Sequence, residues 1–161
     1  MRRRTILTGS AMAAAGLTLM TGLAVAQQPA DIDAIKEANT AFYAALSARD
    51  AKAMGGLWAN KPYVVNIGPL SKTIAVGYED AVSKYWANAF TNVFSELSAS
   101  MTSMAQIQTD GKLAWVVGTE NAKGKTKAGA TVAFDIFVTN IYEKDGNHWL
   151  MVSHHAGIQS K

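Results

Sequence analysis

The chain contains no cysteine among its 161 residues. This absence excludes disulfide bonds, thiolate metal ligands and a cysteine nucleophile, and it leaves the redox compartment open. Proline is scarce, with three residues, and we find neither an internal repeat nor a linker that would divide the chain. About half of the residues are hydrophobic and 17% are charged, so the composition predicts one globular domain with a real core.

The chain also has little net charge. The 15 lysines and arginines outnumber the 12 acidic residues by three, and Arg2, Arg3 and Arg4 account for that difference. The rest of the chain is neutral, so the basic isoelectric point does not indicate a nucleic-acid partner. Phosphate-binding glycine loops, nucleophile elbows and zinc motifs are missing as well. We therefore expect no nucleic acid, metal or cofactor to be bound.

No hydrophobic run is long enough for a comfortable membrane span of about 20 residues. The longest, residues 11–23, follows a basic start and precedes Ala24-Val25-Ala26, a small-x-small pattern that signal peptidases cleave. We expect residues 1–26 to be a signal peptide cleaved after Ala26, and residues 27–161 to form a periplasmic or secreted domain without a membrane span.

The sequence leaves the export route open between two alternatives. Arg3-Arg4-Thr5-Ile6-Leu7 resembles the twin-arginine signal, in which two apolar residues follow two arginines and one variable residue. An ordinary secretory signal that happens to contain three arginines is the other alternative.

Helical periodicity dominates the first part of the exported chain. Apolar residues recur at helical spacing over residues 31–48, and Asp50 can cap a second, shorter helix. Residues 79–90 predict a third helix, and residues 63–67 and 73–76 predict short strands.

From Phe94 onward the period changes to two, which predicts long strands. Residues 122–130 have the composition of a mobile basic loop, and residues 131–157 form two strands joined by Lys144-Asp145-Gly146-Asn147, a hairpin signal. Helices followed by sequential strands predict an α+β fold, with N-terminal helices packed on a curved antiparallel sheet.

Two polar residues in the predicted hairpin are candidate catalytic groups. Asp135 lies in an apolar strand, where a buried carboxylate would have a raised pKa. Strict alternation places His155 on the same strand face as Trp149, and histidine titrates near neutral pH. The alternative interpretation is an aspartate at a rim or in an ion pair, and a histidine hydrogen-bonded in the sheet or at a dimer interface.

The mature chain resembles the SnoaL-like group of the nuclear transport factor 2-like superfamily. The resemblance covers about residues 31–159 and depends on the order and spacing of several segments rather than on one motif. These are residues 34–48 with 51–58, Val65-Asn66-Ile67-Gly68-Pro69, Gly77-Tyr78-Glu79-Asp80-Ala81 leading to Tyr85-Trp86, Val138-Thr139-Asn140-Ile141-Tyr142, Asp145-Gly146-Asn147-His148-Trp149 and Val152-Ser153-His154-His155.

The resemblance implies a cone of helices against a curved sheet, a cavity inside the cone and frequent homodimers through the outer face of the sheet. It does not settle function, because the family includes isomerases, cyclases, dehydratases and association domains. Two departures matter. Phe137 occupies the place where related chains often carry arginine, and a second cavity aspartate is missing, with Asn66 the nearest polar residue.

These observations predict a cavity that binds a small, largely apolar molecule. If the protein is an enzyme, the expected chemistry is cofactor-free proton transfer, as in isomerisation, cyclisation or dehydration, with Asp135 or His155 as the base. The alternative is a non-catalytic ligand-binding or self-association module. The residues expected to line the pocket are Tyr43, Trp58, Asn66, Trp86, Trp115 and Phe137.

Overall fold

The computed structural model describes residues 29–160, so the expected signal peptide lies outside the described residues. The first helix, α1, spans Pro29–Ala48. The short helix α2, Ala51–Gly56, begins as predicted at Asp50, whose carboxylate accepts a hydrogen bond of 2.9 Å from the backbone N–H of Ala53. The residues that α1 buries recur at helical spacing and form one stripe: Ile35, Asn39, Phe42, Tyr43, Ala45 and Leu46.

The predicted third helix is present but is built largely of wide, π-type turns. It consists of η1 (Glu79–Lys84), α3 (Tyr85–Asn88) and η2 (Ala89–Val93). Such turns hold an extra residue and are frequent near functional sites. This helical segment buries Ala81, Val82, Trp86 and Phe90.

Six strands form one sheet in the order β2-β1-β6-β5-β4-β3. Their bounds are β1 Val65–Ile67, β2 Ala75–Val76, β3 Phe94–Thr109, β4 Leu113–Thr126, β5 Thr131–Asp145 and β6 His148–Ile158. The α+β prediction is confirmed, but the sheet is mixed because β1 runs parallel to β6.

The predicted loop over residues 122–130 is mostly strand. Gly124 in β4 pairs with Leu97 on one side and with Val132 on the other, so the ladder continues to Thr126. The basic side chains nearby mark an exposed strand end, which the composition alone could not distinguish from a loop.

A β-bulge in β6 changes which residues face the helices. Ile141 pairs with Ser153, but the next residue, Tyr142, pairs with Met151, so Val152 is an extra residue in the ladder. An extra residue reverses the alternation beyond it. Met151 and His154 are therefore both buried, and the prediction that Trp149 and His155 share a face is wrong.

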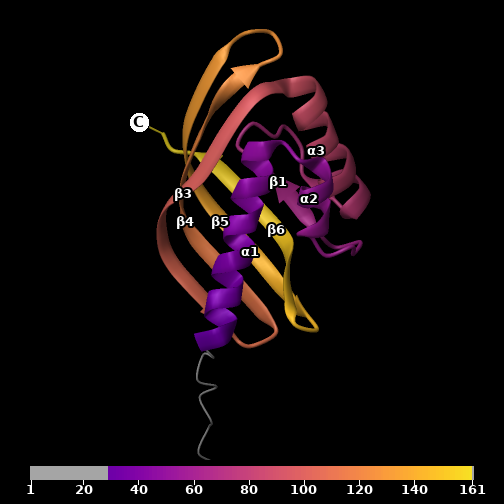
Figure 1. Ribbon diagram of the computed structural model, residues 1–161, viewed down its shortest axis with the longest axis vertical. Coiled ribbons are helices and arrows are strands. Elements are labelled where there is room, and N and C mark those ends of the chain that lie inside the picture. The colour runs from indigo at the N-terminus through magenta and orange to yellow at the C-terminus, as the bar shows by residue number, and fades with distance from the viewer. Residues whose placement is uncertain (1–28, 161) are drawn as a thin grey trace, which may run out of the picture.

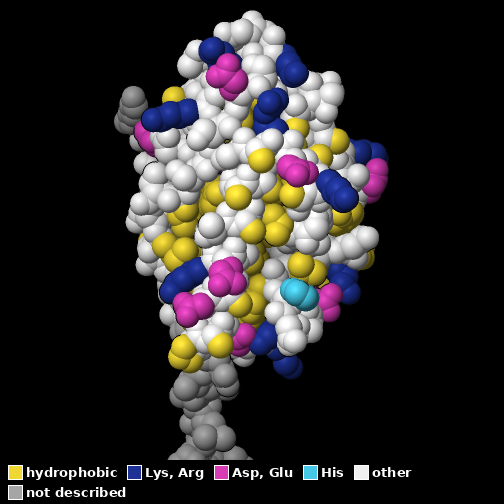
Figure 2. Space-filling model, in the orientation of Figure 1, with side chains coloured by type: hydrophobic (Ala, Val, Ile, Leu, Met, Phe, Trp, Pro, Cys, Tyr) yellow, Lys and Arg dark blue, Asp and Glu magenta, His cyan; other side chains and the backbone are white. Residues whose placement is uncertain are grey.

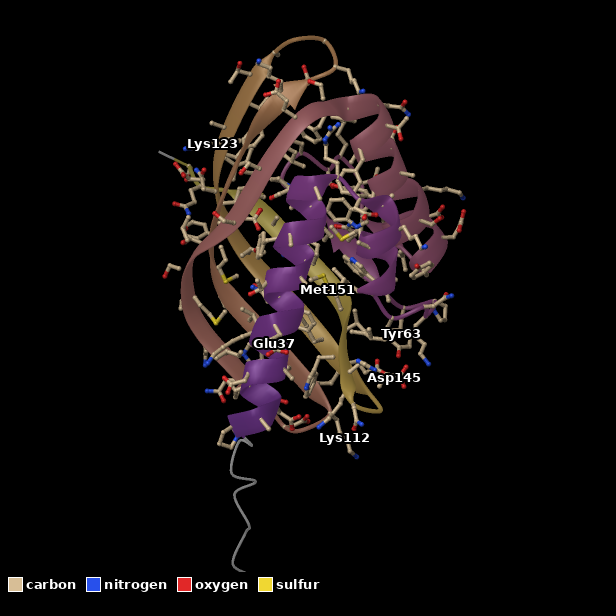
Figure 3. All side chains as sticks on the ribbon, viewed as in Figure 1. Glu37, Tyr63, Lys112, Lys123, Asp145 and Met151 are labelled. Carbon is tan, nitrogen blue, oxygen red and sulfur yellow. The ribbon has the colours of Figure 1, made fainter. Side chains whose placement is uncertain are left out.

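The helices lie over one face of the sheet. Figure 1 shows α1 crossing the sheet while the long strand β3 bends around it. In Figure 3, Met151 is labelled on β6 next to α1, and its side chain is fully buried in the core. Tyr63 lies at the edge of the same view near Asp145, where its hydroxyl donates a 2.6 Å hydrogen bond to Glu143.

The visible surface carries charges of both signs. On the face drawn in Figure 2, the lysine, arginine, aspartate and glutamate side chains are interspersed, with hydrophobic atoms between them. Among the described residues, no helix has the length and hydrophobicity needed to cross a membrane.

Candidate functional site

A cavity of about 340 Å³ lies between the inner face of the sheet, the helical segment 79–93 and the loop after β1. Its volume is at the lower end of the range for small-molecule sites. Most of its walls are apolar, and the carboxyl group of Glu120 and the imidazole of His154 also line it. The principal apolar lining residues are Leu46, Trp86, Val93, Leu97, Val132, Phe134 and Ile136.

Glu120 is a buried carboxyl group on β4, with only 4% of its surface exposed. The hydroxyl of Tyr43 on α1 donates a 2.7 Å hydrogen bond to its Oε2 atom. Burial raises the pKa of Glu120, and the bond from Tyr43 opposes that rise. The group can therefore hold a proton at a higher pH than an exposed glutamate does.

His154 is a buried histidine on β6, with 3% of its surface exposed. Its ring packs against Phe42 with the ring centroids 5.0 Å apart, and its Nδ1 atom lies 2.7 Å from Oδ1 of Asn140. Burial, with a smaller effect of the neighbouring His155 charge, lowers the pKa of His154 to about 3. The imidazole in the cavity is therefore neutral at neutral pH.

Buried polar side chains behind the cavity wall connect these two groups. Asn140 forms a hydrogen bond with His154, and its side chain also forms a hydrogen bond with the hydroxyl of Tyr43. That hydroxyl in turn donates to Glu120. Burial raises the pKa of Tyr43, followed by the effect of the Glu120 charge, so Tyr43 remains a neutral donor. Asn39 extends the network, because its Oδ1 atom accepts bonds of 2.9 Å from both Asn140 and Tyr142.

The loop after β1 forms another wall of the cavity and depends on a glycine. A Cβ atom on Gly68 would lie 2.0 Å from the hydroxyl oxygen of Tyr85. The backbone N–H of Gly68 donates a 2.9 Å bond to Oγ of Ser71, which lies 3.4 Å from the same tyrosine hydroxyl. Glycine thus allows the loop to approach α3 closely.

The structure does not bring the two predicted catalytic residues into the cavity. Asp135 and His155 are both exposed, on the opposite side of the sheet from Ile136 and His154. The carboxylate of Asp135 accepts a 2.9 Å bond from Asn121. A catalytic role for Asp135 and His155 stays a prediction, and the polar side chains that line the cavity include Glu120 and His154 instead.

The predicted pocket residues divide into three groups. Trp86 lines the cavity, and Tyr43 supports it through Glu120. Trp58 and Asn66 are buried outside the lining, and the amide of Asn66 donates to the carbonyl of Ala81. Trp115 and Phe137 belong to the outer face of the sheet, with 40% and 61% of their surfaces exposed.

Glu120 and His154 are the cavity groups that sequence reasoning missed. A signal for Glu120 was present, because it shares strand parity with the buried Ala114, Val116 and Gly118. For His154 no comparable signal existed, since the bulge at Val152 determines its face. Among residues 29–160, no cluster of three or more histidine and acidic side chains could hold a metal ion.

The profile of the SnoaL-like domain matches residues 35–159. The chain belongs to the SnoaL-like family. No curated protein matches it.

Solved structures described as nuclear transport factor 2-like share the fold of this chain. A proposed dehydratase of that family from Streptomyces avermitilis is 23% identical, with a TM-score of 0.71 over 81% of this chain and 98% of the other. A ketosteroid isomerase-like protein from Erwinia carotovora atroseptica is 18% identical, with a TM-score of 0.68 over 81% and 98%.

A third similar structure is a proposed association domain of a calcium/calmodulin-dependent protein kinase type II from Thiobacillus denitrificans. It is 26% identical, with a TM-score of 0.65 over 78% of this chain and 94% of the other. Together the three structures support the predicted fold, and their names span catalytic and assembly functions.

Proposed function

We propose that this SnoaL-like domain binds a small, largely apolar molecule in its cavity and exchanges a proton with it through Glu120. The observation that carries the proposal is the placement of Glu120, a buried carboxyl group, in the apolar cavity wall. Buried carboxyl groups with raised pKa values are suited to general acid–base catalysis near neutral pH.

The environment of Glu120 suggests how the transfer would work. Tyr43 donates to Oε2 and holds the carboxyl group in place, and no other hydrogen bond to this group occurs within residues 29–160. Oε1 is therefore the atom available to take a proton from a bound molecule. The apolar walls keep water from competing for that proton.

The proposed chemistry agrees with the names of two similar structures. The structures from Streptomyces avermitilis and Erwinia carotovora atroseptica are described as a proposed dehydratase and as ketosteroid isomerase-like. Dehydration and ketone isomerisation both require a carbon-bound proton to be moved, which a single carboxylate can do. We propose isomerisation, cyclisation or dehydration as the reaction class.

The test is exchange of carbon-bound hydrogen with deuterated water, followed by mass spectrometry on a panel of cyclic ketones and hydroxyketones. We expect Glu120→Gln to slow the exchange by roughly 100-fold or more, because the amide cannot accept the proton. Glu37→Gln makes the same chemical change on the exposed surface of α1 and should not alter the rate. Equal rates in the wild type and Glu120→Gln would refute the role of Glu120.

A self-association module is the second candidate, and the outer face of the sheet favours it. Trp115, Val117, Phe137 and Ile141 lie on that face of neighbouring strands β4 and β5. Exposed apolar patches of this kind often mark interaction sites. We propose that two copies of the chain pair through this face.

Sedimentation velocity tests the pairing. We expect the wild type to sediment as a homodimer and Phe137→Lys to sediment as a monomer, because a buried lysine in the interface would have no partner. Lys72→Ala, a change on an exposed loop, serves as the control. A monomeric wild type would contradict the proposed interface.

A further inference from the structure

The donor and the acceptor of each buried hydrogen bond behind the cavity can be assigned in turn, starting from the contact of Asn39 with Met101. Nδ2 of Asn39 lies 3.6 Å from the Sδ atom of Met101. A thioether sulfur can only accept a hydrogen bond, so the amide group of Asn39 must be the one that faces it. The carbonyl oxygen of Asn39 then faces Tyr142 and Asn140, and both of these must donate to it.

This assignment determines the orientation of the next amide. Asn140 uses its Nδ2 group to donate to Asn39, so its Oδ1 atom faces His154 at 2.7 Å. A carbonyl oxygen is an acceptor only, and Nδ1 of His154 must therefore carry the hydrogen. Asn39 and Asn140 are positioning residues for this ring, because neither lines the cavity and Asn140 holds the ring through Nδ1.

The remaining ring nitrogen is the one that a ligand meets. A neutral imidazole with its hydrogen on Nδ1 has an unshared electron pair on Nε2. No hydrogen bond to Nε2 occurs in the described part of the chain, and the ring lines the cavity. Burial also lowers the pKa of His154, which keeps the ring uncharged.

We propose that the cavity selects a ligand carrying a hydroxyl group or another hydrogen-bond donor, because Met101, Asn39 and Asn140 fix His154 as an acceptor at Nε2. This inference rests on the proposed ligand-binding function and specifies its substrate class. A ketone oxygen at the same place would face an acceptor, leaving both groups without a donor. The substrate is therefore a largely apolar alcohol or hydroxyketone rather than a simple ketone.

The tautomer is tested first, on the wild-type protein without ligand. Long-range ¹H–¹⁵N correlation spectra at neutral pH distinguish a protonated ring nitrogen from an unprotonated one. We expect His154 to show a protonated Nδ1 and an unprotonated Nε2. The reverse tautomer, or a charged ring, overturns the proposal.

Ligand selection is tested next, with the matched pair 2-decalol and 2-decalone in calorimetric titrations. We expect the alcohol to bind roughly threefold to tenfold more tightly, the range for one net hydrogen bond. In His154→Phe the preference should disappear, while His148→Phe, at an exposed position, should retain it.

The outcomes separate the two proposals. Equal binding of both compounds leaves the ligand-binding function in place and overturns the selectivity. If neither compound binds, the ligand-binding function fails and the selectivity fails with it, whichever tautomer the spectra show. If His154→Phe does not fold, the wild-type spectra and the wild-type affinity ratio still decide the question.

Discussion

Burial moves the pKa values of Glu120 and His154, which both line the cavity, in opposite directions. Each residue is kept closer to its neutral form, because a low-dielectric environment disfavours charge. For Glu120 the pKa is raised, and for His154 it is lowered to about 3. At neutral pH the cavity therefore contains a neutral imidazole and a carboxyl group that releases its proton less readily than an exposed one.

The pH dependence of stability follows from the histidine. The ordinary pKa of the imidazole is 6.5 and the folded value is about 3, so between these limits the unfolded chain binds a proton that the native chain does not. Stability is therefore lost as the pH falls through this window, by an amount on the order of a few kcal/mol. We expect the melting temperature of the wild type to fall between pH 7 and pH 4 more than that of His154→Gln.

Comparison of these two proteins isolates the contribution of His154. Glu120 acts in the opposite sense, since its raised pKa gives a contribution that is present at low pH and lost as the pH rises, but both proteins contain it. A gap in melting temperature that stays constant from pH 7 to pH 4 would show that His154 is not held neutral by the fold.

At the scale of single elements, β3 bends where β4 provides space for it. The pairing of β3 with β4 has register shifts on either side of Ser103 and Met104. A Cβ atom on Gly118 of β4 would lie 2.1 Å from the backbone oxygen of Ser103. The bend that wraps β3 around α1 thus requires a residue without a side chain opposite the bulge.

Replacement of this glycine should be costly. We expect Gly118→Ala to lower the free energy of unfolding by about 1–3 kcal/mol, because the backbone of β3 must move. Gly157→Ala is a matched control within the same sheet, since a Cβ atom there meets nothing within 4 Å. Urea denaturation of both variants makes the comparison, and equal losses would count against the close approach.

Strand alternation predicted the elements well but did not predict which residues enter the cavity. The helix-capping aspartate, the turn at Gly146 and the alternation along β5 are local features, and each appears where the sequence indicates. The bulge at Val152 is not local, because it depends on how β6 pairs with β5. One extra residue placed His154, rather than His155, in the cavity.

At the scale of the whole molecule, export is a proposal that concerns residues outside the described part of the chain. Cleavage after Ala26 would leave a mature chain that begins at Gln27, two residues before α1. We expect mass spectrometry of protein from the periplasm or medium to give the mass of residues 27–161. Full-length protein found only in the cytoplasm would contradict both the signal and the predicted location.

A change of the arginine pair tests the export route separately. Replacement of Arg3 and Arg4 by lysines should block export if the twin-arginine route is used, because that route reads the arginines themselves. An ordinary secretory signal needs only positive charge at its start, so export by that route should continue.

The sequence by itself determined the class of the fold and the order of its elements, because these depend on periodicity, capping and turn residues that act over short distances. The family followed from the resemblance of several segments, in their order and spacing, to SnoaL-like chains. Only the tertiary structure decided the site. Glu120 and His154 come from different strands. Two residues of α1 support them over long distances in sequence: Tyr43 bonds to Glu120, 77 residues away, and Asn39 bonds to Asn140, 101 residues away. Such contacts depend on strand register and on one bulge, which no local pattern specifies.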